Sequence, residues 1–263
     1  MSTLQDYRQI ARNPDRFEQM VRNRPEVQRS IAYFQENIGK VTTTEEFLKD
    51  DKLYRFVMEA FDLGSQTFAR GLMRKVLNEG VTDPASTANR MNDAKFKELA
   101  TVLGFKENGG AGLKAPEVVQ AIVDRYVDVR LEVSAEEKNP AVRLALYFQR
   151  KAPRINNWYQ VMADRALQKV VFTALNIPDQ AAMHDLDSLK VKLSARFDIE
   201  DFKDPAKVQK FLDRFSAMYD LKNGTSQVST GVPSIGPIRR NGRAPVITID
   251  PSITMSLMKF PRF

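Results

Sequence analysis

The single histidine, His184, is the first candidate for chemistry, because Asp185 and Asp187 lie next to it. A serine–histidine–aspartate site also needs a serine held in a strained turn, and the sequence contains no G-x-S-x-G motif. The absence of cysteine excludes disulfide bonds, thiolate metal sites and thiol nucleophiles. We therefore interpret His184 as a surface or helix-capping residue and predict no catalytic residues.

Four acidic residues, Asp198, Glu200, Asp201 and Asp204, superficially resemble a calcium-binding loop. They lack the glycine at the sixth position and the glutamate at the twelfth that such a loop needs. Helix capping explains them better, since Asp204 stands directly before a proline. We predict no metal site and no cofactor.

The glycine-rich stretch KENGGAGLK, residues 106–114, matches neither the phosphate-binding loop of nucleotide hydrolases nor the dinucleotide fingerprint. Both motifs need a preceding strand, and none is predicted here. We interpret this stretch as a connection between helices.

Three arginines, Arg239, Arg240 and Arg243, form the densest basic cluster. Residues 222–263 hold six basic residues and one aspartate, so they carry +5 of the net charge of +7 and leave +2 on the rest. Arginines without interleaved aromatic residues give weak, salt-sensitive contacts with nucleic acids. A basic-tailed, nucleic-acid-associated or regulatory protein stays an alternative, and nucleic-acid binding is not the favoured function.

The elements that would carry these residues are helices. Asp50 or Asp51 stands before Leu53, Phe56, Val57, Ala60 and Phe61, whose spacing follows one face of an α-helix. No apolar–polar alternation typical of strands occurs before residue 222. The predicted fold class is all-α.

Other local patterns extend this prediction. Ser65 precedes an apolar series that starts at Phe68, and Asp83-Pro84 is predicted to open a short helix. Residues 116–135 are predicted to form a long, central buried helix. Tyr159, with the aromatic residues around it, is predicted to pack in a core.

An internal repeat organises the helices. Residues 33–63 align without gaps on residues 147–177 after a shift of 114, and their apolar positions coincide. We predict two related multi-helix units packed together and followed by an extended, mostly irregular tail. The residues predicted to be buried in the two units are Phe56, Val57, Phe61, Val170, Val171 and Leu175.

The predicted division of the chain has five parts. They are an N-terminal helical arm (1–22), a first helical unit (23–105), a linker with a long connecting helix (106–138), a second helical unit (139–221) and a flexible basic tail (222–263).

The tail ends in a short apolar element although its beginning is polar. Its predicted partner-docking residues are Val246, Ile247, Ile249, Ile253, Leu257, Phe260 and Phe263. Apolar side chains gathered in this way indicate a segment that folds on binding. The partner is the body of the same chain, another copy in a homo-oligomer, or a different protein.

No apolar run reaches the length that spans a bilayer, and the first residues lack the apolar region of a secretory signal. The predicted location is the cytoplasm, with export through a specialised route that needs no such signal as the alternative.

The stretches FLKDDKLYRFVMEAFDL and LALYFQRKAP, with FARGLMRKVLNEG, resemble an uncharacterised alphaproteobacterial family, the domain-of-unknown-function family numbered 1217. The resemblance covers residues 4–221. It implies an all-helical fold, often in tandem units, and no known catalytic residues. Genes of that family tend to lie near flagellar basal-body genes, so the resemblance also implies a role in flagellar assembly or structure.

The predicted function is therefore that of a non-enzymatic structural or interaction protein associated with the bacterial flagellum, with protein partners. An enzyme with an unrecognised site is the more remote alternative, since no paired catalytic groups are visible.

Overall fold

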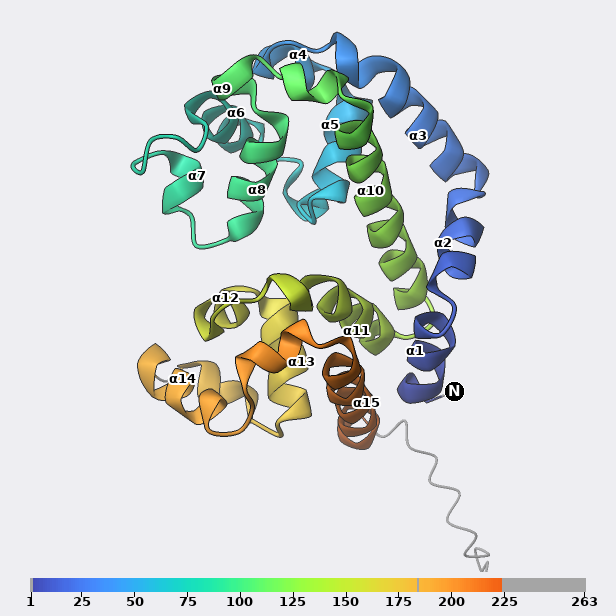
Figure 1. The fold of residues 1–263 in the computed structure, drawn as a ribbon, viewed down its shortest axis with the longest axis vertical. Coiled ribbons are helices and arrows are strands. Elements are labelled where there is room, and N and C mark those ends of the chain that lie inside the picture. The colour runs from blue at the N-terminus through green and yellow to red at the C-terminus, as the bar shows by residue number, and fades with distance from the viewer. Residues whose placement is uncertain (1, 184, 224–263) are drawn as a thin grey trace, which may run out of the picture. The chain divides into compact units, whose positions relative to one another are not determined.

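The computed structural model describes residues 2–183 and 185–223, and all regular structure within them is helical, as predicted (Figure 1). Two hydrophobic cores divide the helices into two lobes. The first lobe contains α2 (Pro14–Arg22), α3 (Pro25–Asn37), η1 (Ile38–Lys40), α4 (Thr44–Lys49), α5 (Asp51–Ala60), η2 (Gly64–Gln66), α6 (Arg70–Glu79), α7 (Thr87–Arg90), α8 (Ala94–Leu103), α9 (Phe105–Asn108), η3 (Ala111–Lys114) and α10 (Pro116–Glu136).

The second lobe takes the first helix of the chain and the helices that follow α10. It contains α1 (Thr3–Ala11), α11 (Pro140–Lys151), η4 (Ala152–Arg154), α12 (Trp158–Ala163), α13 (Arg165–Ala174), η5 (Asp179–Met183), α14 (Leu186–Ser194), η6 (Ile199–Lys203) and α15 (Pro205–Lys222).

Aspartate caps start the central helix of each lobe. The Asp50 carboxylate accepts hydrogen bonds from the backbone amides of Lys52 and Leu53, both at 3.0 Å, at the start of α5. Asp164 accepts from the second and third amides of α13 in the same way. These bonds satisfy amide groups that a helix start leaves unpaired, which is why each helix begins where it does.

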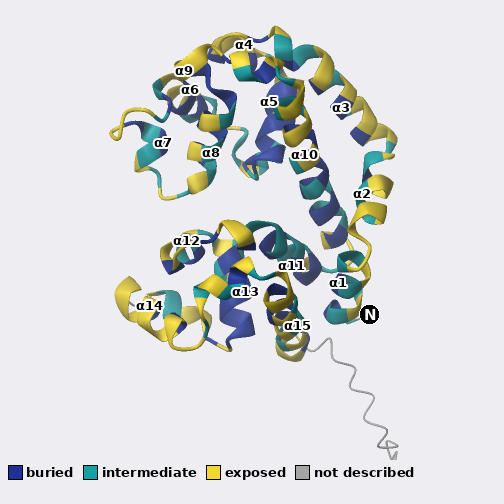
Figure 2. Cartoon of the chain, viewed as in Figure 1, coloured by how far each residue is buried: buried dark blue, intermediate teal, exposed yellow. Residues whose placement is uncertain are grey.

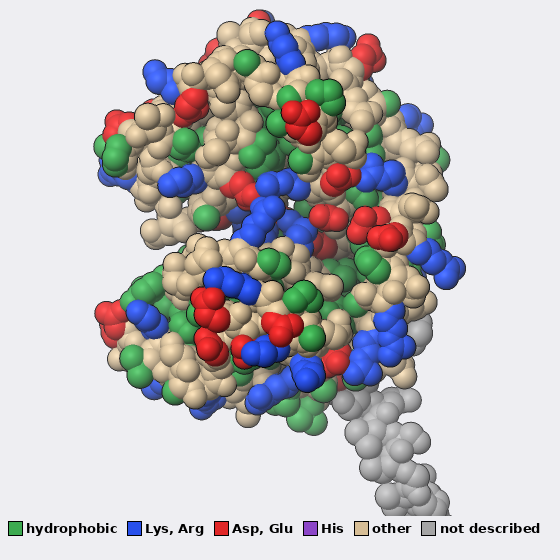
Figure 3. Space-filling model, in the orientation of Figure 1, with side chains coloured by type: hydrophobic (Ala, Val, Ile, Leu, Met, Phe, Trp, Pro, Cys, Tyr) green, Lys and Arg blue, Asp and Glu red, His purple; other side chains and the backbone are tan. Residues whose placement is uncertain are grey.

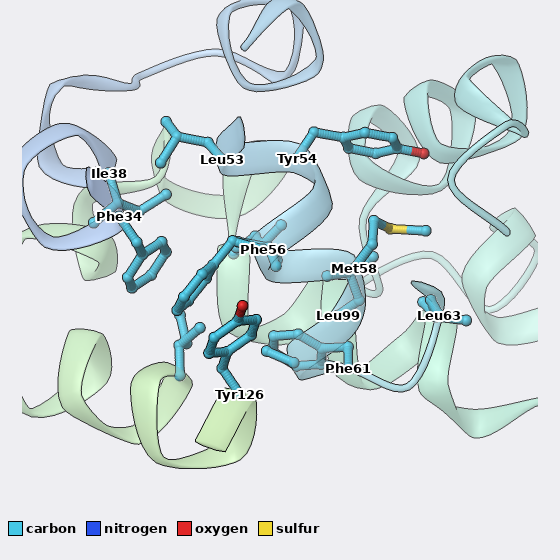
Figure 4. Packing of buried hydrophobic residues seen from close by; sticks show 14 of the residues in the cluster. Phe34, Ile38, Leu53, Tyr54, Phe56, Met58, Phe61, Leu63, Leu99 and Tyr126 are labelled. Atoms are coloured by element: carbon cyan, nitrogen blue, oxygen red, sulfur yellow. The ribbon is translucent and has the colours of Figure 1, made fainter. Parts of the chain in front are cut away.

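The first core is built around a stack of aromatic rings. The Phe56 ring lies 4.4 Å from that of Phe34 and 4.0 Å from that of Tyr126, measured between centroids (Figure 4). Phe56, Val57 and Phe61 are at most 4% exposed, which confirms the prediction that they are buried. The rings join α3, α5 and α10, so the long helix α10 is part of this core, as the sequence indicated.

The second core surrounds α13. Val170 and Val171 are fully buried and Leu175 is 3% exposed, which confirms the remaining burial predictions. In Figure 2 the inner faces of α5 and α13 are both buried. Phe148 and Phe202 pack edge to face beside α13, with a centroid distance of 5.1 Å.

The N-terminal arm divides between the lobes. Helix α1 packs on α11 and α15, whereas α2 packs on α10 and α3. The backbone amide of Thr3 donates a 2.9 Å hydrogen bond to Asp220, and Arg8 forms a 2.8 Å ion pair with Asp213. These contacts fasten the start of the chain to α15.

Three local predictions were wrong. Phe68 is 84% exposed because residues 64–66 form a separate 3-10 turn, and α6 starts only at Arg70. Asp83 accepts a hydrogen bond from the Ala85 amide within a turn, so the next helix starts later, at Thr87. Tyr159 is 40% exposed because its hydroxyl donates to the Asp187 carboxylate at the surface.

The predicted repeat has a counterpart in the bounds of the elements. After a shift of 114, η1, α4 and α5 coincide residue for residue with η4, α12 and α13. The positions after α5 and α13, Asp62 and Asn176, both have positive φ, at 59° and 52°. The superposition of the two units as whole bodies and the five-part division of the chain stay predictions.

Candidate functional site

The candidate site lies where α8 of the first lobe faces the second lobe. Residues of α8, α11, α12 and the turns next to them line a cavity of about 250 Å³. Lysine and arginine side chains gather beside the hollow between the lobes in Figure 3. Because both lobes contribute to its walls, the cavity exists only when the two lobes are held together.

Arg150 is the centre of the contact between the lobes. Its guanidinium group donates to Asp62 of the first lobe, with an Nη2–Oδ1 distance of 2.7 Å, and to Glu132 of α10, with an Nε–Oε1 distance of 2.7 Å. The Asp62 carboxylate also lies 2.9 Å from the Lys151 ammonium group. Burial raises the pKa of Asp62, but the charges of Arg150 and Lys151 outweigh it and hold that pKa below its ordinary value.

The backbone places Asp62 there. This residue follows α5 and has φ of 59°, a conformation that non-glycine residues seldom adopt. It ends the helix and directs a carboxylate that is only 9% exposed toward α11. Without that turn the carboxylate of the first lobe would not reach the guanidinium of the second.

A second group joins the lobes along the wall of the cavity. Lys95 of α8 forms a 3.1 Å ion pair with Asp164, which caps α13. Within the second lobe, the Tyr147 hydroxyl donates a further hydrogen bond to the Asp164 carboxylate at 2.5 Å. Burial raises the pKa of Asp164, yet the charge of Lys95 and the hydrogen bond from Tyr147 lower it more, so it lies below its ordinary value.

The mouth of the cavity has a third group. One oxygen of Glu98 accepts from both Arg125 and Arg154, at 2.6 Å in each case. The Arg154 side chain is 62% exposed and comes from the second lobe, whereas Arg125 belongs to α10. Arg154 is therefore the most exposed of the basic side chains that line the cavity.

These ion pairs hold the two lobes of the chain together. The lysine and arginine side chains named above each have a carboxylate partner. Such pairs suit the joining of two surfaces or the binding of a polar partner that exchanges with them.

An acidic group lies on the other side of Arg150. Asp128 of α10 lines a cavity of about 280 Å³ together with Glu18 and Glu132. Among the described residues, its carboxylate has no hydrogen bond and no ion pair. Burial, with the neighbouring acids, raises the pKa of Asp128 to about 6.

The residues of the predicted sites lie outside the described residues. This holds for the docking residues of the tail, for the basic cluster Arg239, Arg240 and Arg243, and for His184. The acidic cluster that resembled a calcium loop is described, and it caps helices as predicted: Asp198 caps η6 and Asp204 caps α15.

Within residues 2–183 and 185–223, no helix has the length and apolar character needed to cross a membrane. These residues also contain no cluster of three or more acidic or histidine side chains placed to hold a metal ion.

The contact between the lobes was not predicted from the sequence. One signal for it was present, because Tyr33 and Asp50 recur as Tyr147 and Asp164 after the shift of 114. The hydroxyl of each tyrosine donates to the aspartate 17 residues later. The partners Lys95 and Asp62 gave no such signal, since only the tertiary structure brings them to the second lobe.

Comparisons with known proteins give a family and a fold. A family model described as a protein of unknown function (DUF1217) matches residues 60–208, from the end of α5 into α15. The crystal structure of protein AGR_C_984 from Agrobacterium tumefaciens has 33% sequence identity, covers 85% of this chain and 97% of its own, and superposes with a TM-score of 0.78. No curated protein matches the sequence. The family model spans more than half of the residues, including the groups that join the lobes, so the chain belongs to the DUF1217 family.

Proposed function

We propose that this protein is a non-enzymatic interaction protein that takes part in the assembly or structure of the bacterial flagellum. Its helical body is the scaffold, and the C-terminal residues 244–263 are the element that docks. The pairing of charges between the lobes, such as Arg150 with Asp62, holds the body together as one scaffold. The observation that carries the proposal is the apolar character of residues 244–263, which calls for a partner that covers them.

The sequence of the tail supports a protein partner. The apolar residues of residues 244–263 would cost solubility if nothing covered them, so an intramolecular or intermolecular partner is expected. A homo-oligomer formed through the tail is one form that this proposal takes. The flagellar part rests on the family resemblance, because genes of that family tend to lie near basal-body genes.

Deletion of the gene tests the flagellar role. We expect the deletion strain to lose swimming motility and a tagged copy of the protein to gather at flagellar bases. Normal swimming together with a diffuse tagged protein would overturn the proposal, and would agree with a cytoplasmic protein of another function. A chain that ends at Asn223 is the matched variant, and we expect it to fold but not to restore swimming.

Nucleic-acid binding is the second candidate because the basic charge is concentrated in the tail. Replacement of Arg239, Arg240 and Arg243 by alanine should then weaken binding to a random DNA duplex and reduce its dependence on salt. If the unaltered chain shows no duplex binding near physiological salt, this candidate fails.

A further inference from the structure

The two lobes follow the same order of elements beyond the repeat found in the sequence. A helix packed on the preceding short helix comes next in both, namely α6 on α4 and α14 on α12. A 3-10 turn then contacts the earlier one, η3 on η1 and η6 on η4. Each lobe closes with a helix that starts at proline and packs on the central helix, α10 on α5 and α15 on α13.

The lobes differ in the segment that follows α6 and α14. Between α6 and η3 the first lobe has residues 80–110, which form α7, α8 and α9, whereas only residues 195–198 separate α14 from η6. Helices α7, α8 and α9 all pack on α6. As a result the α6 residues Met73 and Val76 are fully buried.

Within residues 2–183 and 185–223, helix α14 has no comparable cover. Of its nine residues only Leu189 and Leu193 are buried, while Leu186 is 51% and Val191 69% exposed. Figure 2 shows most of α14 as exposed. A cavity of about 250 Å³ opens beside it, lined by Ile177, Pro178, Ala181, Leu189, Lys192 and Arg196. A helix this short is marginal in water unless tertiary contacts hold it.

The end of the chain has the pattern of a helix that could supply this cover. In α8, Asp93 caps the helix, and the third, seventh and tenth residues after it are the buried Phe96, Ala100 and Leu103. Asp250 is followed at the same three positions by Ile253, Leu257 and Phe260. A proline after Asp250 adds a second signal for a helix start, as after Asp204 of α15.

The chain is long enough for this contact. From Lys222, the last residue of α15, to Asp250 there are roughly 28 residues, which can span at most about 100 Å. The 18 residues of α15 are about 27 Å long, so every part of the second lobe lies within reach.

We propose that residues 250–260 form a helix that packs on α14 of the same chain, in the place that α7, α8 and α9 occupy on α6. This inference rests on the proposed role of the tail as a docking element and gives that element a site within its own chain. Ile253, Leu257 and Phe260 would cover the cavity beside Leu189. A partner protein would then have to displace this contact in order to bind the tail.

Hydrogen exchange of the purified full chain tests the contact without any flagellar component. We expect the amides of α14 to exchange at least about tenfold more slowly in the full chain than in a chain that ends at Asn223. The double variant Leu257→Asp/Phe260→Asp should lose this protection. Met255→Asp is the matched control, because residue 255 lies on the opposite side of the predicted helix, and α6 is the internal control. Equal exchange of α14 in all four chains would overturn the proposal.

A distance measurement separates docking within a chain from docking between chains. The absence of cysteine allows spin labels at Ser188→Cys and Thr254→Cys with no other change. Packed helices lie about 8–10 Å apart, so we expect a narrow distance distribution below roughly 25 Å, unchanged by dilution with unlabelled chain. A short distance that disappears on dilution would show docking on a second copy and would contradict the proposal. If the deletion strain loses swimming but the purified chain lacks this contact, only the docking proposal fails. The two proposals can therefore fail independently.

Discussion

The pair Tyr33–Asp50 in the first lobe and the pair Tyr147–Asp164 in the second are built alike. In both, a tyrosine near the end of one helix donates to the aspartate that caps the central helix, at 2.8 Å and 2.5 Å. The surroundings differ. Lys52 of the same lobe lies over the Tyr33 ring, whereas Lys95 reaches the second pair from the other lobe.

The difference between the pairs shows how one local design serves two purposes. Arg150 follows Tyr147 by three residues on α11, and its guanidinium group lies over the Tyr147 ring. Glu36, with a side chain that is 75% exposed, occupies the equivalent position of the first lobe. The same cap is thus a local helix start in one lobe and part of the contact between lobes in the other. Position in the tertiary structure, and not the cap itself, decides which.

The largest effect is expected where the two lobes do not differ. Phe61 and Leu175 occupy equivalent positions and are 1% and 3% exposed. Phe61→Ala should lower the free energy of unfolding by about 3–5 kcal/mol, and Leu175→Ala by about 2–5 kcal/mol, because each leaves a cavity in a core. Urea denaturation measures both. A loss below about 1 kcal/mol at either position would show that the two cores are not equivalent there.

Removal of Arg150 tests the difference directly. Arg150→Leu should cost about 3–5 kcal/mol, because it leaves the buried carboxylate of Glu132 without a partner and Asp62 with Lys151 alone. Glu36→Leu is the matched control and should change the stability by no more than about 0.5 kcal/mol.

The double variant Arg150→Leu/Glu132→Leu sharpens this result. Since it removes the unpaired charge along with its partner, we expect it to regain most of the lost stability. Thermal unfolding provides the measurement. If the double variant is no more stable than Arg150→Leu alone, the ion pair is not the source of the effect.

The two caps should respond differently to loss of charge. Asparagine still caps a helix, so Asp50→Asn should cost about 0.5 kcal/mol or less, whereas Asp164→Asn should cost about 1–3 kcal/mol through the loss of its charged partner Lys95. The pKa of Asp164 is lowered in the folded protein. Its contribution is therefore present above the ordinary pKa of 3.8 and lost as the pH falls below it. Urea denaturation at a series of pH values measures this effect. The stabilities of the wild type and of Asp164→Asn should converge as the pH falls below 3.8, and a difference that persists at low pH would contradict the prediction.

The smallest effect is expected at Asp128, and it has the opposite sign. Counted from the first proline of each helix, its equivalent in α15 is Ala217, so only the first lobe carries this acid. Because the folded pKa of Asp128 is raised to about 6, the wild-type carboxyl opposes folding increasingly as the pH rises from about 4 to 6. Asp128→Asn should stabilise the protein by about 1–2 kcal/mol at pH 7 and leave it unchanged below about pH 4.

Asp124→Asn is the control for this prediction. Asp124 lies one turn earlier on α10 and pairs with Arg22 at 2.8 Å, so its removal should not stabilise the protein. Equal stabilisation by both substitutions would point to the overall charge of α10 and not to the burial of Asp128.

The sequence determined the helices and the residues of the cores. Caps such as Asp50 and Asp204, the prolines at helix starts and the apolar spacing around Val57 and Val171 act over one or two turns of chain, so they are visible in the order of residues. The family also followed from short stretches of sequence. Local geometry limits this reach, as Phe68 and Asp83-Pro84 show: a 3-10 turn and a capped turn replaced the predicted helix starts.

Only the tertiary structure decided what Tyr147, Arg150 and Asp164 do. Their partners, Asp62 and Lys95, lie 88 and 69 residues away from Arg150 and Asp164, and no spacing rule connects positions that far apart. The same holds for the exposed side of α14, which is seen only by comparison with the covered side of α6. The residues of a helix show which of its faces is apolar. What covers that face, and which charges meet across a contact, depend on how separate elements pack.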